Sequence, residues 1–197
     1  MDNLAKNSDD FTRLEMINGK IIMMSPRPAP FHTLVSGKIY SRLENFLKDK
    51  PCIAFPDGVA VYFDDKNYFV PDCMIVCDKK KIQNDGIHGA PDLVVEVLSQ
   101  GTARFDRGHK KDVYEVSGVK EYWIVDINSK SIEVYLNRDG RFFLDYVYEY
   151  HTDDEIAYNK SLPDNDPRKI ETIDTEIKVG IFDDCRFQLK EIFETGI

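Results

Sequence analysis

The sequence lacks the usual marks of a membrane, exported or zinc-knuckle protein. No stretch approaches the roughly 20 apolar residues that a membrane-spanning helix needs. The amino-terminal residues 1–10 are polar and contain no apolar signal region. The four cysteines, at positions 52, 73, 77 and 185, form no CxxC pair, which argues against a zinc knuckle. We expect a cytoplasmic protein that does not enter a membrane, with residues 1–10 flexible.

The cysteine spacing also predicts free thiols. Cys73 and Cys77 lie on one expected strand, where four residues at about 3.3 Å each place their Cα atoms roughly 13 Å apart. A disulfide needs Cα atoms within about 7 Å. We therefore expect reduced cysteines that pack as small hydrophobic side chains, in keeping with a cytoplasmic protein.

The apolar residues of the chain are numerous enough to form one hydrophobic core. The chain has 197 residues, of which 42% are hydrophobic, with 12 Phe and 10 Tyr, so we expect a single ordered domain over 1–197. The net charge of −9 is unevenly placed, because residues 139–197 hold 15 acids and 7 bases whereas residues 1–138 hold 20 and 19. Neither half shows the strong basic surface of a tight DNA binder.

Periodicity in the first half predicts a hairpin, a helix and three strands. Asn18-Gly19 between two apolar runs is a strong hairpin signal. A helix is expected over 31–50, with one buried apolar stripe formed by Phe31, Leu34, Val35, Ile39, Leu43, Phe46 and Leu47. Strands are expected over 53–63, 69–77 and 93–98, the last buried on both faces, with a loop over 78–90.

The second half predicts a helix followed by further strands. The helix covers 102–117 and stops at Gly118. Strands are expected over 122–127, 131–136, 142–150 and 175–179, a loop over 161–168, and a closing helical turn over 187–193. The fold class is therefore α/β (α+β mixed), with a mixed central β-sheet flanked by helices and an N-terminal β-hairpin.

Carboxylates occupy two of the expected strands. Asp72 opens one apolar run, and Glu96 lies inside another, where an ionised group is costly unless it is paired or bound to metal. Asp92, Val94 and Glu96 share one face of their strand. Neighbouring strands are roughly 4.8 Å apart, so Asp72 and Glu96 could share one cation. Oxygen ligands favour Mg²⁺ or Mn²⁺.

Each of these acids also has a plain structural interpretation, as a salt-bridge partner or a strand-end cap. The same choice applies to the next helix, where Asp106, Lys110 and Tyr114 follow each other at i,i+4 spacing on one stripe. Spacing alone is compatible with an ordinary ion pair there. His32, near the start of the first helix, is by itself more typical of a structural histidine.

Taken together, these motifs resemble the Uma2 family, a bacterial group formerly catalogued as a domain of unknown function. The similarity covers most of residues 13–127 and, more weakly, the rest. Its motifs are Glu15-Met-Ile-Asn-Gly-Lys20, Met24-Ser-Pro26, His32, Pro71-Asp72, Pro91-Asp92-Leu-Val-Val-Glu96-Val-Leu-Ser99, Asp106-x-x-x-Lys110-x-x-x-Tyr114 and Gly118-Val-Lys-Glu-Tyr-Trp-Ile-Val-Asp126.

The Uma2 family in turn resembles the PD-(D/E)XK nucleases, which have the restriction-endonuclease-like fold. The resemblance implies an Mg²⁺-dependent endonuclease acting on nucleic-acid phosphodiesters, most often DNA, with Mn²⁺ as a substitute ion. Asp72 matches the first acid and Glu96 the second. Leu98 stands where the superfamily has its lysine, and Lys110 on the following helix matches the family's lysine.

The resemblance assigns roles on this basis. Asp72, Glu96 and the Val97 carbonyl would hold the metal, and Lys110 would orient or deprotonate the attacking water. The secondary candidates are Asp92, Tyr114 and His32.

Two alternatives remain open at the level of sequence. The first is a catalytically weak or silent nuclease-like fold that acts as a nucleic-acid-binding or regulatory module, which the acidic tail and Leu98 favour. The second is a purely structural acid cluster. A homodimer is compatible with an endonuclease, because two sites can cut both strands of a duplex.

Overall fold

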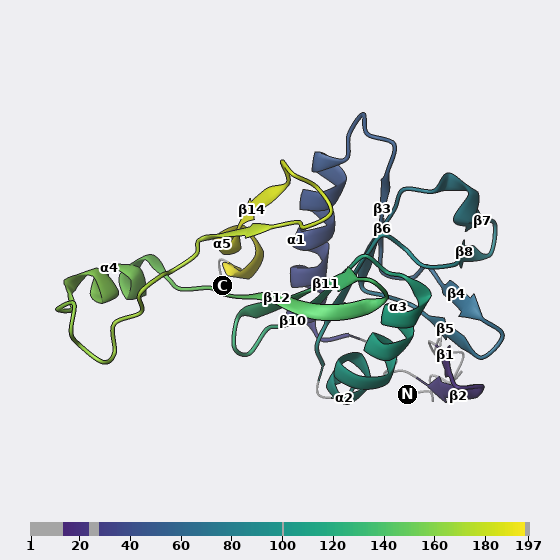
Figure 1. Ribbon diagram of the computed structural model, residues 1–197, viewed down its shortest axis with the longest axis horizontal. Helices are drawn as coiled ribbons and strands as arrows, with labels where there is room; N and C mark the ends of the chain where they lie inside the picture. Colours follow the sequence, from purple (N-terminus) through teal and green to yellow (C-terminus); the bar gives the residue numbers. More distant parts are fainter. Residues whose placement is uncertain (1–13, 24–27, 100, 196–197) are drawn as a thin grey trace, which may run out of the picture.

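The computed structural model of the protein describes residues 14–23, 28–99 and 101–195 (Figure 1). The expected flexible segment 1–10 and the Met24–Pro26 motif lie outside these ranges. The described residues form two six-stranded sheets, a two-stranded hairpin and helices on both sides of the central sheet.

The central sheet is mixed, as expected. Its strands, in chain order, are β3 (Ile53–Pro56), β6 (Cys73–Val76), β9 (Leu93–Val97), β10 (Glu121–Asp126), β11 (Ser131–Arg138) and β12 (Arg141–Glu149). They lie in the order β12-β11-β10-β9-β6-β3. Only the β9–β10 pair is parallel, and the other pairs are antiparallel.

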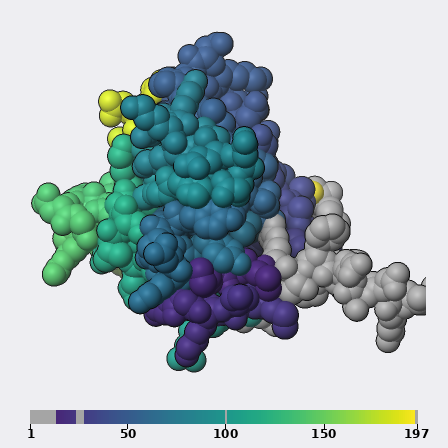
Figure 2. All heavy atoms as spheres, turned by 90° about the vertical axis from the view of Figure 1, so that its right-hand side faces the viewer, coloured from purple at the N-terminus to yellow at the C-terminus, as the bar shows by residue number. Residues whose placement is uncertain are grey.

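A second sheet packs beside the first. Its strands are β1 (Leu14–Ile17), β2 (Lys20–Met23), β4 (Val61–Asp64), β5 (Asn67–Phe69), β7 (Ile82–Gln83) and β8 (Gly86–His88), in the order β2-β1-β5-β4-β8-β7. Figure 2 looks onto this side of the molecule, with the purple β1–β2 hairpin at the lower rim. The Asn18-Gly19 turn is confirmed, since both residues have positive φ, 51° and 74°.

The second sheet corrects two expectations. The predicted strands 53–63 and 69–77 are each divided, because the chain leaves the central sheet after Pro56 and returns only at Cys73. The apolar character of both runs continues across the break, because the residues on each side of it pack into a hydrophobic core. The segment 78–90, predicted as a loop, holds a 3₁₀ turn (Lys79–Lys81) and strands β7 and β8.

Helices cover both faces of the central sheet. The described helices are α1 (Pro30–Phe46), α2 (Ala103–Phe105), the π-helical turn η2 (Asp106–Lys110), α3 (Lys111–Ser117), α4 (Asp153–Ser161), which lies apart from the sheet, and α5 (Leu189–Phe193). The small hairpin consists of β13 (Glu176–Lys178) and β14 (Arg186–Gln188). α1 and α5 pack on one face with the small hairpin, while α3 and the second sheet pack on the other.

The first helix is shorter than predicted. It ends at Phe46, and Asp49 adopts a positive φ of 65° before Pro51. Phe31, predicted to be buried, is 48% exposed, because it lies in the first turn of α1 beyond the edge of the core. The second predicted helix is confirmed in extent, and Gly118 ends it with φ 88°.

α4 was not predicted, because its segment shows no apolar periodicity that would mark a buried face. A capping box between Thr152 and Glu155 starts the helix, and no side chain of the helix is buried. Figure 1 shows α4 and the following loop projecting away from the two sheets.

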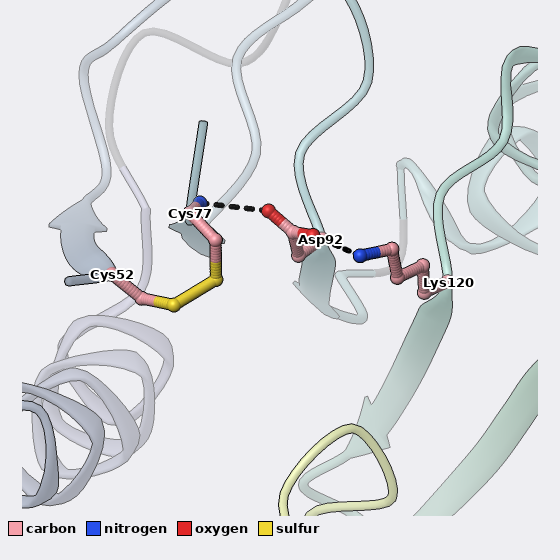
Figure 3. Close-up of a disulfide and its surroundings, with 4 residues drawn as sticks. All are labelled: Cys52, Cys77, Asp92 and Lys120. Atoms are coloured by element: carbon pink, nitrogen blue, oxygen red, sulfur yellow. Dashed lines mark hydrogen bonds and ion pairs between the residues drawn. A yellow bond between two sulfur atoms is a disulfide. The ribbon is translucent and has the colours of Figure 1, made fainter. Parts of the chain in front are cut away.

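The expectation that all cysteines are free is wrong. Cys52 and Cys77 form a disulfide across the β3–β6 pair (Figure 3). Cys73 and Cys185 are free and buried. The spacing argument excluded only a Cys73–Cys77 bond; the bond forms because Cys52 and Cys77 continue the antiparallel register beyond Ile53↔Val76. The cytoplasmic expectation thus loses the support of reduced thiols. Among the described helices, none has the length and apolar character to cross a bilayer.

Candidate active site

The antiparallel pairing of β6 with β9 brings Asp72 and Glu96 together. The register pairs Cys73 with Val95, so one further step sets Asp72 opposite Glu96. Leu93, Val95 and Val97 point into the core beneath α1, whereas Val94 faces α3. Glu96 therefore points to the α3 side, as the alternation of a strand requires.

Asp72 is held by two neighbours. Its Oδ2 accepts a hydrogen bond from the Val97 N–H at 2.7 Å and lies 3.3 Å from Nε2 of His32. Burial acts to lower the pKa of His32, but the hydrogen bond and charge of Asp72 outweigh it, with help from the Val97 carbonyl, and raise that pKa. The first turn of α1 thus reaches the ends of β6 and β9.

Lys110 lies at the centre of a buried acid cluster. Its Nζ is 2.9 Å from Oε1 of Glu15, 3.1 Å from Oε1 of Glu96 and 3.4 Å from Oδ1 of Asp106. Lys110 is 1% exposed and Glu96 3%. The π-helical turn over Asp106–Lys110 keeps both of its end residues facing β9.

Burial and charge oppose each other in this cluster. Burial raises the pKa of Glu96 well above its usual value, and the Lys110 charge only partly offsets this. Burial likewise raises the pKa of Asp106, and the Lys110 charge again offsets only part of this rise. For Lys110, burial acts to lower the pKa, but Glu96, Glu15 and Asp106 together raise it. The lysine is therefore an ammonium ion.

Tyr114 completes the wall of the cluster. Its hydroxyl donates to Oε1 of Glu96 at 2.6 Å, so Glu96 Oε1 accepts from both Lys110 and Tyr114. Its ring packs edge-on against Phe63 and Phe69 of the second sheet. The stripe expected on the second helix thus lines the site with all three of its residues.

Asp92 lies elsewhere. It directly precedes β9, at the end of the strand opposite Glu96, roughly 13 Å away at about 3.3 Å per residue. There its carboxylate accepts from the Cys77 N–H at 2.7 Å and pairs with Nζ of Lys120 at 2.7 Å (Figure 3). Among the predicted site residues, Asp72, Glu96, Val97, Lys110, Tyr114 and His32 come together, and Asp92 does not.

Glu15 belongs to the cluster but was not singled out as a site residue. It lies on β1, between the outward-facing neighbours Leu14 and Met16, and is 1% exposed. Besides its place in the Glu15-Met-Ile-Asn-Gly-Lys20 motif, its signal in the sequence was a carboxylate at an alternating position of an otherwise apolar hairpin strand. Its contact with Lys110 joins segments 95 residues apart, which no local pattern predicts.

The donor set suits a hard divalent ion. Two carboxylates, Asp72 and Glu96, face each other across adjacent strands, and the Val97 carbonyl follows directly. One oxygen of Glu15 is buried beside them with no hydrogen-bond partner in the described part of the chain. Within the same residues, no group of three or more acidic, histidine or cysteine side chains is already gathered as a metal site. The fit therefore rests on the two acids and one backbone carbonyl.

Comparison of the sequence with known proteins finds relatives in cyanobacteria. Two uncharacterized Synechocystis proteins, slr1290 and sll1609, are 28% identical over 127 residues and 26% identical over 145 residues. These stretches cover 64% and 72% of this chain, and 66% and 81% of the two relatives. The chain therefore spans just under two thirds of the first relative.

Comparison of the structure with solved structures finds one with a similar fold. A crystal structure from Anabaena variabilis, described as a "putative nuclease belonging to DUF820", superposes with a TM-score of 0.68 at 18% identity, covering 93% of this chain and 91% of that one. The Uma2 family model, described as "Putative restriction endonuclease", matches residues 3–177. This chain therefore belongs to the Uma2 family.

Proposed function

We propose that the protein is an Mg²⁺-dependent endonuclease that hydrolyses the phosphodiester bonds of DNA. The observation that carries the proposal is the buried Lys110 ammonium in contact with Glu96, one strand away from Asp72. Perturbed groups of this kind cluster at functional sites. The family description, a restriction endonuclease, supports DNA as the substrate.

Asp72, Glu96 and the Val97 carbonyl would hold the ion. When bound, it would polarise a phosphodiester oxygen and lower the pKa of a coordinated water. His32 would fix the orientation of the Asp72 carboxylate, because its ring lies against Oδ2. The Val97 N–H holds the same oxygen from the other side.

Lys110 would act on the reacting phosphate. As an ammonium it would orient the attacking water and balance the negative charge that develops in the transition state. Lys110 reaches the site from the helix that follows β9. It would thus take the place of the superfamily lysine, whose position in the sequence is occupied by Leu98. Tyr114 would hold Glu96 through the hydrogen bond to Oε1.

We further propose that the active form is a homodimer, because two sites can cut both strands of a duplex. The measurement of molecular mass in solution by light scattering tests this separately from activity.

The test of the function is cleavage of supercoiled plasmid and of linear single-stranded DNA in Mg²⁺ or Mn²⁺. We expect cleavage by the wild type that EDTA abolishes. Asp72→Asn, Glu96→Gln and Lys110→Met should each lower the rate by about 100-fold or more. Asp92→Asn is the matched control, because this carboxylate lies at the far end of β9, and should retain activity.

Two outcomes would count against the proposal. Cleavage that survives Glu96→Gln would show that the activity does not depend on this site. No cleavage by the wild type, together with no Glu96-dependent Mn²⁺ binding, would favour a nucleic-acid-binding or regulatory module.

A further inference from the structure

The Lys110 ammonium is shared between two walls of the site. Glu96 and Asp106 approach from β9 and the π-helical turn, whereas Glu15 approaches from β1 of the second sheet. Glu15 makes the shortest of the three contacts, 2.9 Å. The second sheet therefore supplies a partner for Lys110 that does not lie on a strand with either metal-site carboxylate.

Glu15 is poorly explained as a structural residue alone. Its Oε1 accepts from the Val70 N–H at 2.9 Å in addition to Lys110. Its Oε2 is buried, and no hydrogen-bond partner for it exists among the described residues. A buried oxygen left in this way destabilises the folded state. A glutamine or an apolar residue in this strand would avoid the cost of a buried charge.

Glu96 faces a conflict that Glu15 can resolve. Its Oε1 already accepts from both Lys110 and Tyr114. A divalent ion at Asp72 and Glu96 would compete with Lys110 for the same carboxylate. If Glu96 were the only acid beside Lys110, binding the ion would leave a buried ammonium without a partner, which is strongly unfavourable.

We propose that Glu15 is a positioning residue: it holds the Lys110 ammonium in the site, so that the Glu96 carboxylate would be available to hold a divalent ion. This inference rests on the proposed function. Asp106 assists from one turn away on the same helix, at 3.4 Å. Glu15 is the closer partner, at 2.9 Å against 3.4 Å for Asp106.

The test is Mn²⁺ affinity measured by titration calorimetry, in the absence of nucleic acid, on a double-mutant cycle. The variants are Glu15→Gln, Lys110→Met and the two combined. Glu15→Gln should weaken Mn²⁺ binding about tenfold, because Lys110 then depends more on Glu96. In the Lys110→Met background, the same substitution should have a much smaller effect, since no ammonium competes for Glu96.

Controls separate this effect from folding and from general electrostatics. Asp92→Asn removes a buried carboxylate at the other end of β9 and should change the affinity by no more than about twofold. Glu15→Asp keeps the charge and should recover part of the loss. If Glu15→Gln does not fold, the same cycle is run with Glu15→Asp, with a smaller loss expected in the same direction.

The outcomes distinguish this inference from the function on which it rests. An equal or larger effect of Glu15→Gln in the Lys110→Met background would overturn the positioning role. Glu15 would then affect Mn²⁺ binding only through its own charge or through its hydrogen bond to the Val70 N–H. Wild-type Mn²⁺ binding that Glu96→Gln leaves unchanged, or that is absent, would overturn the proposed metal site together with this role.

Discussion

Lys110 is a charged side chain in a place where charge is normally excluded. Its stability there comes from three carboxylates within 3.4 Å of its Nζ. These carboxylates in turn depend on it, since burial alone would disfavour their ionised forms. At the residue scale the cluster is thus one unit, and its members should not be separable in their effects on stability.

We expect Lys110→Met to destabilise the protein by about 3–5 kcal/mol at neutral pH, because it leaves buried carboxylates unpaired. The loss should shrink as the pH falls. Burial raises the folded-state pKa of Glu96 and Asp106 above the pKa of about 4 that these groups have in the unfolded chain. Ionisation of these groups therefore destabilises the folded state at neutral pH, and protonation at lower pH removes this destabilisation.

Urea unfolding at pH 7 and pH 5 measures this difference. Lys111→Met is the matched control on the same helix, because its Nζ lies over the Tyr135 ring, away from the carboxylates, and should cost about 1 kcal/mol or less at both values. A loss from Lys110→Met that is independent of pH would contradict the account of the cluster.

Tyr114→Phe should cost about 1–2 kcal/mol in unfolding free energy. The substitution removes the hydroxyl that donates to Glu96 and keeps the ring that packs on Phe63 and Phe69. The same urea measurement gives the value. A neutral result would mean that the 2.6 Å hydrogen bond to Glu96 contributes nothing to the folded state.

At the scale of elements, the strands of the central sheet could be predicted where one pattern governs the whole run. β9 is buried on both faces, and its apolar run marks it from the sequence. Residues 53–63 and 69–77 could not be divided in the same way, because two sheets bury their side chains in succession. α4 could not be predicted from apolar periodicity, since it buries nothing.

The residues of the site, too, could be grouped from the sequence only in part. Asp106, Lys110 and Tyr114 could be grouped in advance, because they repeat along one helix. Asp72 and Glu96 could be grouped only on the assumption that their strands are neighbours, and the β6–β9 register satisfies it. Glu15 could not be placed beside Lys110, because that contact depends on how the second sheet docks on the first.

Two glycines offer a contrast between elements. Gly86 in β8 has φ 150°, and a Cβ there would lie 2.5 Å from the Ala60 carbonyl oxygen, whereas a Cβ at Gly37 in α1 would meet nothing within 4 Å. Gly86→Ala should cost about 1–3 kcal/mol and Gly37→Ala should stabilise α1 by up to about 1 kcal/mol. Thermal unfolding followed by circular dichroism compares them, and equal effects would contradict the tight packing at β8.

At the scale of the whole molecule, the disulfide joins the neighbouring strands β3 and β6 at the edge of the central sheet. It lies at the end of β6 that is far from Asp72, beside Asp92 (Figure 3). It joins cysteines 25 residues apart in the sequence. Its contribution should therefore be to global stability and not to the geometry of the site.

A reducing agent should lower the stability of the wild type by roughly 3 kcal/mol, the value expected for a loop of this length. The double variant Cys52→Ser/Cys77→Ser should have the lower stability from the start and should not respond to reductant. Thermal unfolding with and without dithiothreitol measures both. A wild type that does not respond would mean that these thiols are not joined in solution.

The most direct test of the central claim is the rate of Mg²⁺-dependent plasmid cleavage by wild type, Glu96→Gln and Glu121→Gln. Glu121 is the matched control, since it is also a fully buried glutamate on a central strand, but it accepts hydrogen bonds from Trp123 and the Gly180 and Ile181 N–H groups, away from Lys110. Circular dichroism first establishes that both variants are folded. The account predicts cleavage by the wild type and Glu121→Gln, and cleavage that is slower by about 100-fold or more for Glu96→Gln. Equal rates for all three proteins would contradict it.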